Sequence, residues 1–206
     1  MREIEVQMFA TLDGVMQAPG GPDEDRSGDF AHGGWSQPYW DEAMGAAMGQ
    51  AMAREYDLLL GRKTYDVFAA YWPNAPKGDP VRRKFDAATK YVVTSDPGTL
   101  AWQNSEAITG DVAGRIAELK GGEGPMLSVQ GSSQLVQALL EHGLVDSFRI
   151  WTFPVVLGTG KRLFGEGAVP LGLALAETET SSTGVVMSRY DAAGDVRTGS
   201  FALKDG

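Results

Sequence analysis

Leu58-Leu59-Leu60-Gly61-Arg62-Lys63-Thr64-Tyr65 is an apolar run that passes through one glycine into a polar segment. A short apolar run that ends at glycine is typical of a strand buried on both faces of a parallel sheet. The pattern that follows predicts a helix over residues 63–70, and a helix N-terminus binds anions through its free N–H groups. The stretch therefore predicts an anion-binding turn, although a helix cap with solvated cations fits the same residues.

The same design recurs at Leu127 to Gln134, where an apolar run leads through Gly131 to Ser132 and Ser133. A third apolar run, 90–95, ends in the hydroxyls of Thr94 and Ser95. In open α/β sheets ligands bind outside the carboxyl ends of the strands, which is where all three turns would lie. Together they favour a phosphate-rich ligand.

Strand and helix patterns alternate along the chain, which predicts an α/β sheet in a single domain, 1–206. The last third is rich in strand patterns joined by short polar turns, which predicts antiparallel hairpins at the edge of the sheet. The predicted strands are 3–10, 56–60, 90–95, 126–130, 145–153, 171–179, 184–190 and 196–203, and the predicted helices are 37–54, 63–70, 110–120 and 132–141.

Composition excludes several kinds of chemistry. The 206 residues include no cysteine and two histidines, so disulfides, thiolate nucleophiles and sulfur-rich zinc sites are ruled out and no metal site is expected. A net charge of −9 opposes general attraction to nucleic acid or to an anionic membrane. No signal peptide is visible, and the apolar stretch 43–53 is about half of the roughly 20 residues that a spanning helix needs. We expect a cytoplasmic protein.

Common nucleotide-binding and hydrolase motifs are absent. Gly158-Thr159-Gly160-Lys161 lacks the upstream glycine of a P-loop, and Leu163 stands where the dinucleotide-binding fingerprint requires glycine. There is also no G-x-S-x-G motif for a hydrolase nucleophile.

Four segments in this order resemble the dihydrofolate reductase-like superfamily: Thr11-Leu12-Asp13-Gly14, Gly61 to Thr64, Gly131-Ser132-Ser133, and the stretch from Pro154 to Phe164. The resemblance spans about residues 3 to 203 and is closest to the riboflavin-biosynthesis reductase domain, the C-terminal part of the deaminase-reductase, and its stand-alone relatives. It implies a mostly parallel eight-stranded sheet flanked by helices, which binds NADPH across the strand ends. The chain departs from the folate reductases in one respect, because Gly131-Ser132 replaces their paired glycines.

The resemblance also implies roles for individual residues. Arg62 would contact the 2′-phosphate of NADPH, because a guanidinium beside helix N–H donors prefers a phosphate to a ribose hydroxyl. The implied cofactor-binding residues are Gly61, Arg62, Lys63, Thr64, Thr94, Ser95, Gly131, Ser132 and Ser133. The implied substrate-binding residues are Thr11, Trp35, Leu157, Gly158 and Gly160.

A carboxyl group is expected to handle or orient the transferred proton, and Asp13 and Asp41 are the candidates by similarity. Asp13-Gly14 also fits a simple turn, but the functional interpretation of Asp13 is favoured, whereas Asp41 fits a favourable acid at a helix start equally well. We expect the glycine-rich loop 19–34, with Phe30 and Trp35, to cover the nicotinamide. For a substrate phosphate the candidate cations are Lys161 and Arg162, or those of residues 82–84.

The function expected from these features is an NADPH-dependent reductase that acts on a small heterocyclic or sugar-linked substrate. The resemblance also favours a homodimer. The alternative substrates are 5-amino-6-(5-phosphoribosylamino)uracil of riboflavin biosynthesis, a pterin or dihydrofolate, and an unrelated imine or carbonyl compound. Two further alternatives are a non-catalytic NADP-binding protein that kept the fold and an interaction protein that uses its C-terminal strands.

Overall fold

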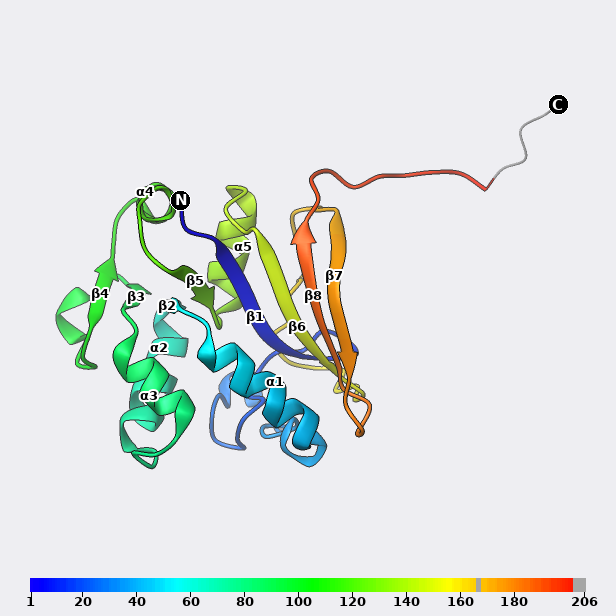
Figure 1. Cartoon of the computed structure of the whole chain (residues 1–206), viewed down its shortest axis with the longest axis horizontal. Coiled ribbons are helices and arrows are strands. Elements are labelled where there is room, and N and C mark those ends of the chain that lie inside the picture. Colours follow the sequence, from blue (N-terminus) through cyan, green and yellow to red (C-terminus); the bar gives the residue numbers. More distant parts are fainter. Residues whose placement is uncertain (166–167, 202–206) are drawn as a thin grey trace.

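A computed structural model describes residues 1–165 and 168–201. Its strands form one sheet in the order β4-β3-β2-β5-β1-β6-β8-β7 (Figure 1). Strands β1 to β6 are parallel, whereas β8 runs antiparallel to both β6 and β7. Their bounds are β1 Ile4–Thr11, β2 Tyr56–Gly61, β3 Lys90–Val93, β4 Ser105–Ile108, β5 Met126–Val129, β6 Ser147–Phe153, β7 Leu173–Thr180 and β8 Val186–Ala192. No helix in the described ranges is long and apolar enough to cross a membrane.

Five α-helices cover the two faces of the sheet: α1 Glu42–Ala53, α2 Arg62–Tyr71, α3 Pro80–Ala87, α4 Val112–Gly121 and α5 Ser133–Glu141 (Figure 1). Because side chains alternate along a strand, neighbouring leucines of β2 enter different cores. Leu59 packs in the cluster that includes residues of α4 and α5. Leu58 and Leu60 pack in a second cluster with side chains of α1, α2 and α3. Both faces of β2 are therefore covered, as its continuous apolar run predicts.

A buried carboxylate ties the antiparallel part of the sheet to the parallel part. Glu5 on β1 is 1% exposed and contacts Arg54 of α1 at 2.7 Å, Arg149 of β6 at 3.5 Å and Arg189 of β8 at 3.3 Å. Burial alone would raise the pKa of Glu5, but the guanidiniums of Arg54 and Arg149 outweigh it and hold that pKa below its ordinary value. Glu5 thus stays ionised as the shared partner of three arginines.

The predicted fold class is confirmed, with a mostly parallel eight-stranded sheet and an antiparallel C-terminal edge. The membership of the sheet differs from the prediction at two places. Strand β4 was not predicted, because four residues that include a glutamate carry little apolar pattern of their own. The strand predicted at 196–203 is wrong for residues 196–201, which lie outside the sheet, while residues 202–203 fall outside the described part of the chain.

Two helices also differ from the prediction. Helix α1 begins at Glu42 rather than at residue 37, because Asp41 caps it and a separate 3-10 turn occupies Gln37–Tyr39. Helix α3 was not predicted, although Asp79 followed by Pro80 is a recognisable helix start. The Asp79 carboxylate accepts hydrogen bonds from the N–H groups of Val81 and Arg82.

Lys90 begins β3 with its side chain buried. Its ammonium donates to the carbonyls of Ala88 at 2.9 Å and Gln103 at 3.0 Å, and lies 4.5 Å from the ring centre of Trp102. Burial lowers the pKa of Lys90 from 10.5 to about 8, against the opposing charges of Asp86 and Asp57. The fold therefore disfavours a charge that the unfolded chain carries freely up to high pH.

The pKa of Lys90 makes stability depend on pH in a defined direction. Between pH 8 and 10.5 the unfolded chain binds more protons at this group than the folded chain does, so the free energy of unfolding rises with pH in that window. We expect Lys90→Met to remove this rise, measured by urea unfolding across the window. Lys77→Met, which changes an exposed lysine, should keep it. Identical pH slopes for the wild type and Lys90→Met would contradict the assignment.

Candidate active site

In the described part of the chain, six parallel strands end along one edge of the sheet, the edge toward which β1 runs in Figure 1. Their spatial order is β4, β3, β2, β5, β1 and β6. The polar turns that follow β2, β3 and β5 are therefore neighbours in space, as the sequence predicts. The turn after β1 and the segment after β6 form the other half of the same edge.

Arg62 links the ends of β2 and β3. As the first residue of α2 it donates to the carboxylate of Asp66 at 2.8 and 3.0 Å. It also donates to the Thr94 hydroxyl at 3.3 Å, to the Asp96 carbonyl at 3.3 Å and to the Thr99 hydroxyl at 2.6 Å. Its side chain keeps 34% of its surface exposed. The guanidinium is thus fixed at the edge of the sheet and still open to solvent.

The turns after β2 and β5 touch each other. A Cβ atom on Gly61 would lie 2.4 Å from Ser132 Oγ, and one on Gly131 would lie 2.7 Å from Thr64 Oγ1. Gly131 also has a φ of +115°, and the Gly131–Ser132 peptide is cis. Gly61 N–H donates to the Gly131 carbonyl at 3.4 Å. The two turns converge as predicted, and only glycine fits where they meet.

Helices α2 and α5 both begin at this contact, and their N-termini are capped differently. The Ser132 hydroxyl accepts from the N–H of Leu135 and so caps α5. At the start of α2, Gly61 occupies the cap position and offers no side-chain acceptor to the first-turn N–H groups. Lys63, which follows Arg62, and Ser95, which follows the Thr94 that Arg62 contacts, are both exposed. The start of α2 therefore presents N–H donors, a guanidinium and hydroxyls, which is the donor set that phosphates prefer.

Asp13 organises the other half of the edge. Its carboxylate accepts from the Thr11 hydroxyl at 2.6 Å and from the N–H groups of Leu157 at 3.2 Å and Gly158 at 2.9 Å. Arg162 adds an ion pair at 3.3 Å. These bonds join the turn after β1 to the segment after β6. The structure thus brings together Thr11, Asp13, Leu157 and Gly158, four of the residues selected from the sequence.

The Thr11 hydrogen bond and the N–H groups of Gly158 and Leu157 lower the pKa of Asp13 to about 2, against a smaller opposing effect of burial. The carboxyl group is therefore ionised at neutral pH and accepts hydrogen bonds rather than donating them. Its geometry suits an orienting residue and does not suit a proton donor.

Asp41 lies apart from this network. It caps α1 by accepting from the N–H of Met44 at 2.9 Å, and it accepts from the N–H and hydroxyl of Ser182 at 2.8 and 2.7 Å. These hydrogen bonds lower the pKa of Asp41. Its contacts fasten α1 to the turn between β7 and β8, so the helix-start interpretation describes this residue better than the catalytic one.

Trp35 belongs to the core, whereas Gly160 is itself exposed and lies against a buried ring. Trp35 is 7% exposed, donates to the Gln17 carbonyl at 2.8 Å and packs edge-on against Phe153. Phe30 is 6% exposed, and a Cβ on Gly160 would lie 2.8 Å from its ring. Both rings are buried although the loop that carries them is polar, because burial of large aromatic rings is strongly favourable. The substrate contacts expected of Trp35 and Gly160 stay predictions.

Loop 19–34 is also fastened to the segment after β6. Gln17 donates to the carbonyls of Asp25 at 3.0 Å and Ser27 at 2.9 Å, and Lys161 pairs with the Asp25 carboxylate. Lys161 is thereby engaged inside the protein, as is Arg162 by Asp13. In α3, Arg82 pairs with Asp86. These cations, considered for a substrate phosphate, already have carboxylate partners.

Two features of the edge were not predicted from the sequence. The first is Thr99, whose hydroxyl makes the shortest contact with Arg62. The turn Asp96-Pro97-Gly98 places Thr99 there and is the sequence feature that could have indicated it. Trp40 is 45% exposed and lies 6.1 Å from the ring centre of Trp151, which stacks on Phe9 at 5.0 Å and 19°. No periodicity marks these three rings, because they come from separate elements.

Solved structures with the same fold place this sheet among known proteins. The structure resembles a putative riboflavin biosynthesis protein from Shewanella sp. PV-4 with a TM-score of 0.62 and 21% identity, covering 93% of this chain and 99% of that one. A pyrimidine reductase-like protein from Corynebacterium diphtheriae gives a TM-score of 0.64 at 14% identity, with 94% and 93% covered. Dihydrofolate reductase from Enterococcus faecalis, complexed with NADP(H), gives 0.57 at 14% identity, with 92% and 96% covered. The fold is that of the dihydrofolate reductases.

Residues 2–187 match the RibD C-terminal domain family, and the chain belongs to that family. Two Bacillus subtilis proteins of uncharacterised function are also similar in sequence. YyaP is 30% identical over 136 residues, which cover 65% of this chain and 72% of YyaP. YwjB is 30% identical over 109 residues, which cover 53% of this chain and 58% of YwjB. Family and fold together support a reductase-like function.

The contact between the two turns predicts a penalty specific to Gly131. Gly131→Ala places a methyl group against Thr64 at a positive φ, so we expect a loss of about 1–3 kcal/mol in the free energy of unfolding. Gly143→Ala is the matched control, because Gly143 has a φ of +62° and nothing within 4 Å of the added methyl. That control should lose only about 1 kcal/mol in urea unfolding. Equal losses would show that the turns are not in close contact.

Proposed function

We propose that this protein is an NADPH-dependent reductase that transfers a hydride to a small substrate with a flat heterocyclic ring. The observation that carries the proposal is the convergence of the β2–α2 and β5–α5 turns beside Arg62, at the carboxyl ends of the central strands. This is the position at which open α/β sheets bind ligands.

The residues along the β3–β2–β5 half of the edge fit a cofactor that carries several phosphates. Arg62, with Thr94 beside it, would hold the 2′-phosphate, and Gly61, Lys63 and Thr64 would hold the adenosine side together with Ser95. Gly131, Ser132 and Ser133 would lie along the pyrophosphate. When bound, NADPH supplies the hydride. A bound phosphate would replace the Asp66 carboxylate as the ionic partner of Arg62. Because the phosphate carries more negative charge than a carboxylate, the exchange would favour binding.

The other half of the edge fits the substrate. Trp40 on the approach to α1 is 45% exposed and packs against two inner rings, the partly buried Phe9 of β1 and the buried Trp151 of β6. The exposed Trp40 ring favours stacking with a flat ring. A riboflavin-pathway pyrimidine and a pterin or dihydrofolate both meet this requirement. Because Lys161 and Arg162 are engaged by carboxylates, recognition through the ring is favoured over recognition through a substrate phosphate.

Asp13 would act as a positioning residue for this substrate. Its ionised carboxylate holds the N–H groups of Leu157 and Gly158 in place next to the end of β1. With a pKa of about 2 it carries no proton to give near neutral pH, so we assign the proton that completes the reduction to water.

A non-catalytic NADP-binding protein is the second candidate. It is favoured by one observation, namely that the carboxylates of Asp13 and Asp41 are both engaged in hydrogen bonds within the protein. Turnover of any pyrimidine or pterin with NADPH would exclude it.

Arg62 should set the preference for NADPH over NADH. We expect NADPH to raise the melting temperature more than NADH does, and Arg62→Ala to weaken NADPH binding roughly tenfold to hundredfold, the equivalent of one charge-assisted contact. NADH binding should change little. Arg83→Ala, at an exposed arginine of α3, is the control and should keep the preference. Equal stabilisation of the wild-type protein by both cofactors would refute the cofactor assignment.

Asp13→Asn should separate catalysis from cofactor binding. An amide nitrogen cannot accept from the Gly158 N–H, so the segment after β6 shifts and kcat/KM falls roughly tenfold to hundredfold. NADPH affinity should stay nearly unchanged, and the wild-type rate should show no ionisation from this residue between about pH 4 and 9. NADPH oxidation with pyrimidines and pterins measures both effects, with the exposed Asp23→Asn as control. An unchanged kcat/KM would remove Asp13 from the mechanism.

A further inference from the structure

Two glutamines are neighbours in the centre of the sheet, where β5 ends beside β1. Gln7 belongs to β1, and Gln130 is the residue that follows β5. Both are half-buried, whereas Val6 and Val129, which precede them, are fully buried. The two strands pair in parallel with Val6 opposite Val129, so the next residues, Gln7 and Gln130, lie side by side.

Both glutamine side chains are on the side of the sheet that α1 covers. Gln7 donates to Glu5 Oε1 at 2.7 Å, and Glu5 pairs with Arg54 at the end of α1. Gln130 hydrogen-bonds with Tyr56, whose hydroxyl contacts a methionine sulfur of α1 at 3.3 Å. A polar pair is therefore enclosed between a helix and a sheet, where apolar side chains are the rule.

The glutamine pair lies between the proposed sites of substrate and cofactor. Because side chains alternate along a strand, Phe9 is on the same side of β1 as Gln7. The Phe9 ring lies 6.3 Å from the ring of the exposed Trp40, measured between their centres. On the other strand, Gly131 follows Gln130 directly and begins the turn assigned to the pyrophosphate.

The contact with Glu5 fixes the orientation of the Gln7 amide. Glu5 is ionised and only accepts hydrogen bonds, so the amide nitrogen faces it and the amide oxygen is turned away. Within residues 1–165 and 168–201 this oxygen receives no hydrogen bond, and it is not among the buried atoms that lack a partner, so it is open to solvent. Gln7 therefore offers an acceptor.

The Gln130 amide offers the complementary group. Its nitrogen donates to the Ser128 hydroxyl at 3.2 Å, which uses one of its two hydrogens and leaves the other to donate. Neighbouring strands lie about 4.8 Å apart, so the acceptor of Gln7 and the donor of Gln130 span the edge of one small ring.

We propose that Gln7 and Gln130 select the substrate by a lactam edge, in which a ring carbonyl is next to a ring N–H. The ring N–H would donate to Gln7 Oε1, and the ring carbonyl would accept from Gln130 Nε2. Primary amides recognise the edges of nucleobases through the same pairing of donor and acceptor. The inference rests on the proposed function for the position of the substrate, and it narrows the substrate class to lactam heterocycles such as pyrimidinediones and pterins.

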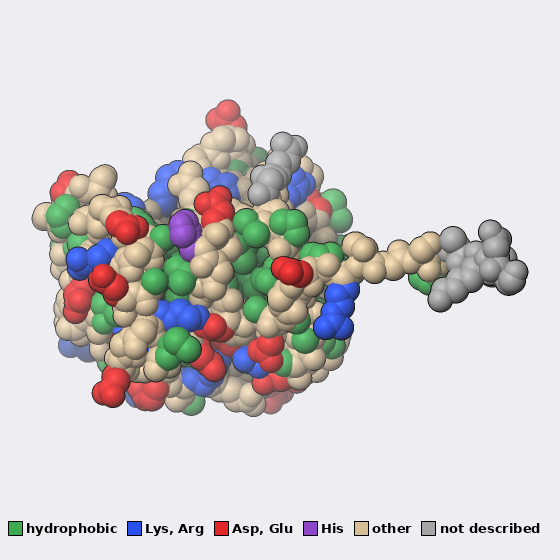
Figure 2. All heavy atoms as spheres, turned by 90° about the horizontal axis from the view of Figure 1, so that it is seen from above, with side chains coloured by type: hydrophobic (Ala, Val, Ile, Leu, Met, Phe, Trp, Pro, Cys, Tyr) green, Lys and Arg blue, Asp and Glu red, His purple; other side chains and the backbone are tan. Residues whose placement is uncertain are grey.

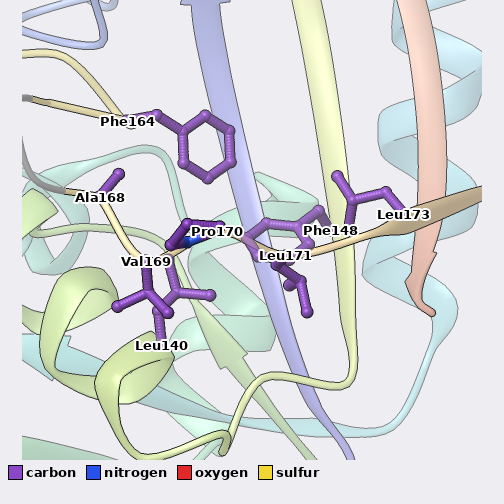
Figure 3. A pocket seen from close by; sticks show the side chains of 8 residues that line it. All are labelled: Leu140, Phe148, Phe164, Ala168, Val169, Pro170, Leu171 and Leu173. Carbon is purple, nitrogen blue, oxygen red and sulfur yellow. The ribbon is translucent and has the colours of Figure 1, made fainter. Parts of the chain in front are cut away.

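Two other hollows of the described chain lack this pair of groups. The pocket in Figure 3, about 280 Å³, is lined among the described residues by apolar side chains alone, so it cannot recognise a ring edge. The second, about 450 Å³, contains Arg54, Arg149 and Arg189, which already form ion pairs. On the face seen in Figure 2 acidic and basic side chains are mixed. The glutamine pair is the better match for a neutral polar ring.

Ring binding tests the inference without relying on turnover. The full-length protein is titrated in a calorimeter, with and without NADP⁺, with pteridine-2,4-dione and with its 3-methyl derivative, which has a methyl group in place of the ring N–H between the carbonyls. The wild-type protein should bind the dione roughly tenfold more tightly than the methylated ring, the equivalent of one hydrogen bond. Gln7→Met should abolish this preference. Gln130→Met should weaken binding of both rings roughly tenfold and keep the preference.

Gln50→Met, the same substitution at an exposed glutamine of α1, is the matched control and should bind both rings as the wild type does. A wild-type protein that binds the two rings equally, or binds neither, would overturn the inference, as would a Gln7→Met variant that keeps the preference. The comparison of the two rings on the wild-type protein needs no variant, so the inference stays falsifiable if Gln7→Met does not fold.

NADPH oxidation separates this inference from the proposed function. A ring preference that Gln7→Met abolishes, without NADPH oxidation by the wild type, would support the glutamine pair and refute the reductase alone. Reduction of a ring by a wild-type protein that does not distinguish the dione from its methylated form would refute the glutamine pair alone.

Discussion

The contact between the turns after β2 and β5 leaves no room for a side chain at Gly61 or Gly131, and the arrangement of the edge depends on it. It exists because β5 lies between β2 and β1, although β5 comes later in the sequence than either. The same insertion divides the carboxyl-terminal edge of the parallel strands. On one side lie Arg62 and the hydroxyls around it, and on the other lie Asp13 and the segment after β6. The two halves could not meet at one ligand if either turn carried a methyl group at the contact.

In a chain whose net charge is −9, carboxylates outnumber the cations. Most of the cations at residues 62–63, 82–84 and 161–162 form ion pairs, as Arg82 does with Asp86 and Lys161 does with Asp25. Arg62 also has one, but Asp66 is half exposed and Arg62 keeps three further oxygen acceptors that hold it in position. A guanidinium fixed in this way has lost its rotamer freedom before any phosphate arrives, so less entropy is lost when a ligand binds. Arg162 is held in a comparable way by the Asp13 carboxylate and by the carbonyls of Asp13 and Gly158, but it lies on the Asp13 side of the edge.

The fold could be predicted from the sequence where local pattern and tertiary environment agree. Apolar runs such as Leu58 to Leu60 are buried on both faces, and glycine follows them because the backbone comes close to a neighbouring turn. Contacts between distant parts of the chain could not be predicted in this way. Trp35 lies in a polar, glycine-rich region but packs against Phe153, and Asp41 caps α1 as its position indicates but also accepts from Ser182, 141 positions away. The rings of Phe9, Trp40 and Trp151 could not be grouped for the same reason. Strand β4 belongs to the sheet because β3 is beside it rather than because of its own pattern.

Glu5 shows how closely the C-terminal hairpin of β7 and β8 is joined to the parallel strands. Its carboxylate is inside the parallel part, yet one of its three guanidiniums comes from β8. A chain that ended before the hairpin would keep Arg54 and Arg149 around Glu5 but would open this buried charge to water on the side of Arg189. The hairpin is therefore part of the same folding unit as the parallel strands. Shuffling it between relatives should work only when the carboxylate on β1 and the arginine on β8 move together.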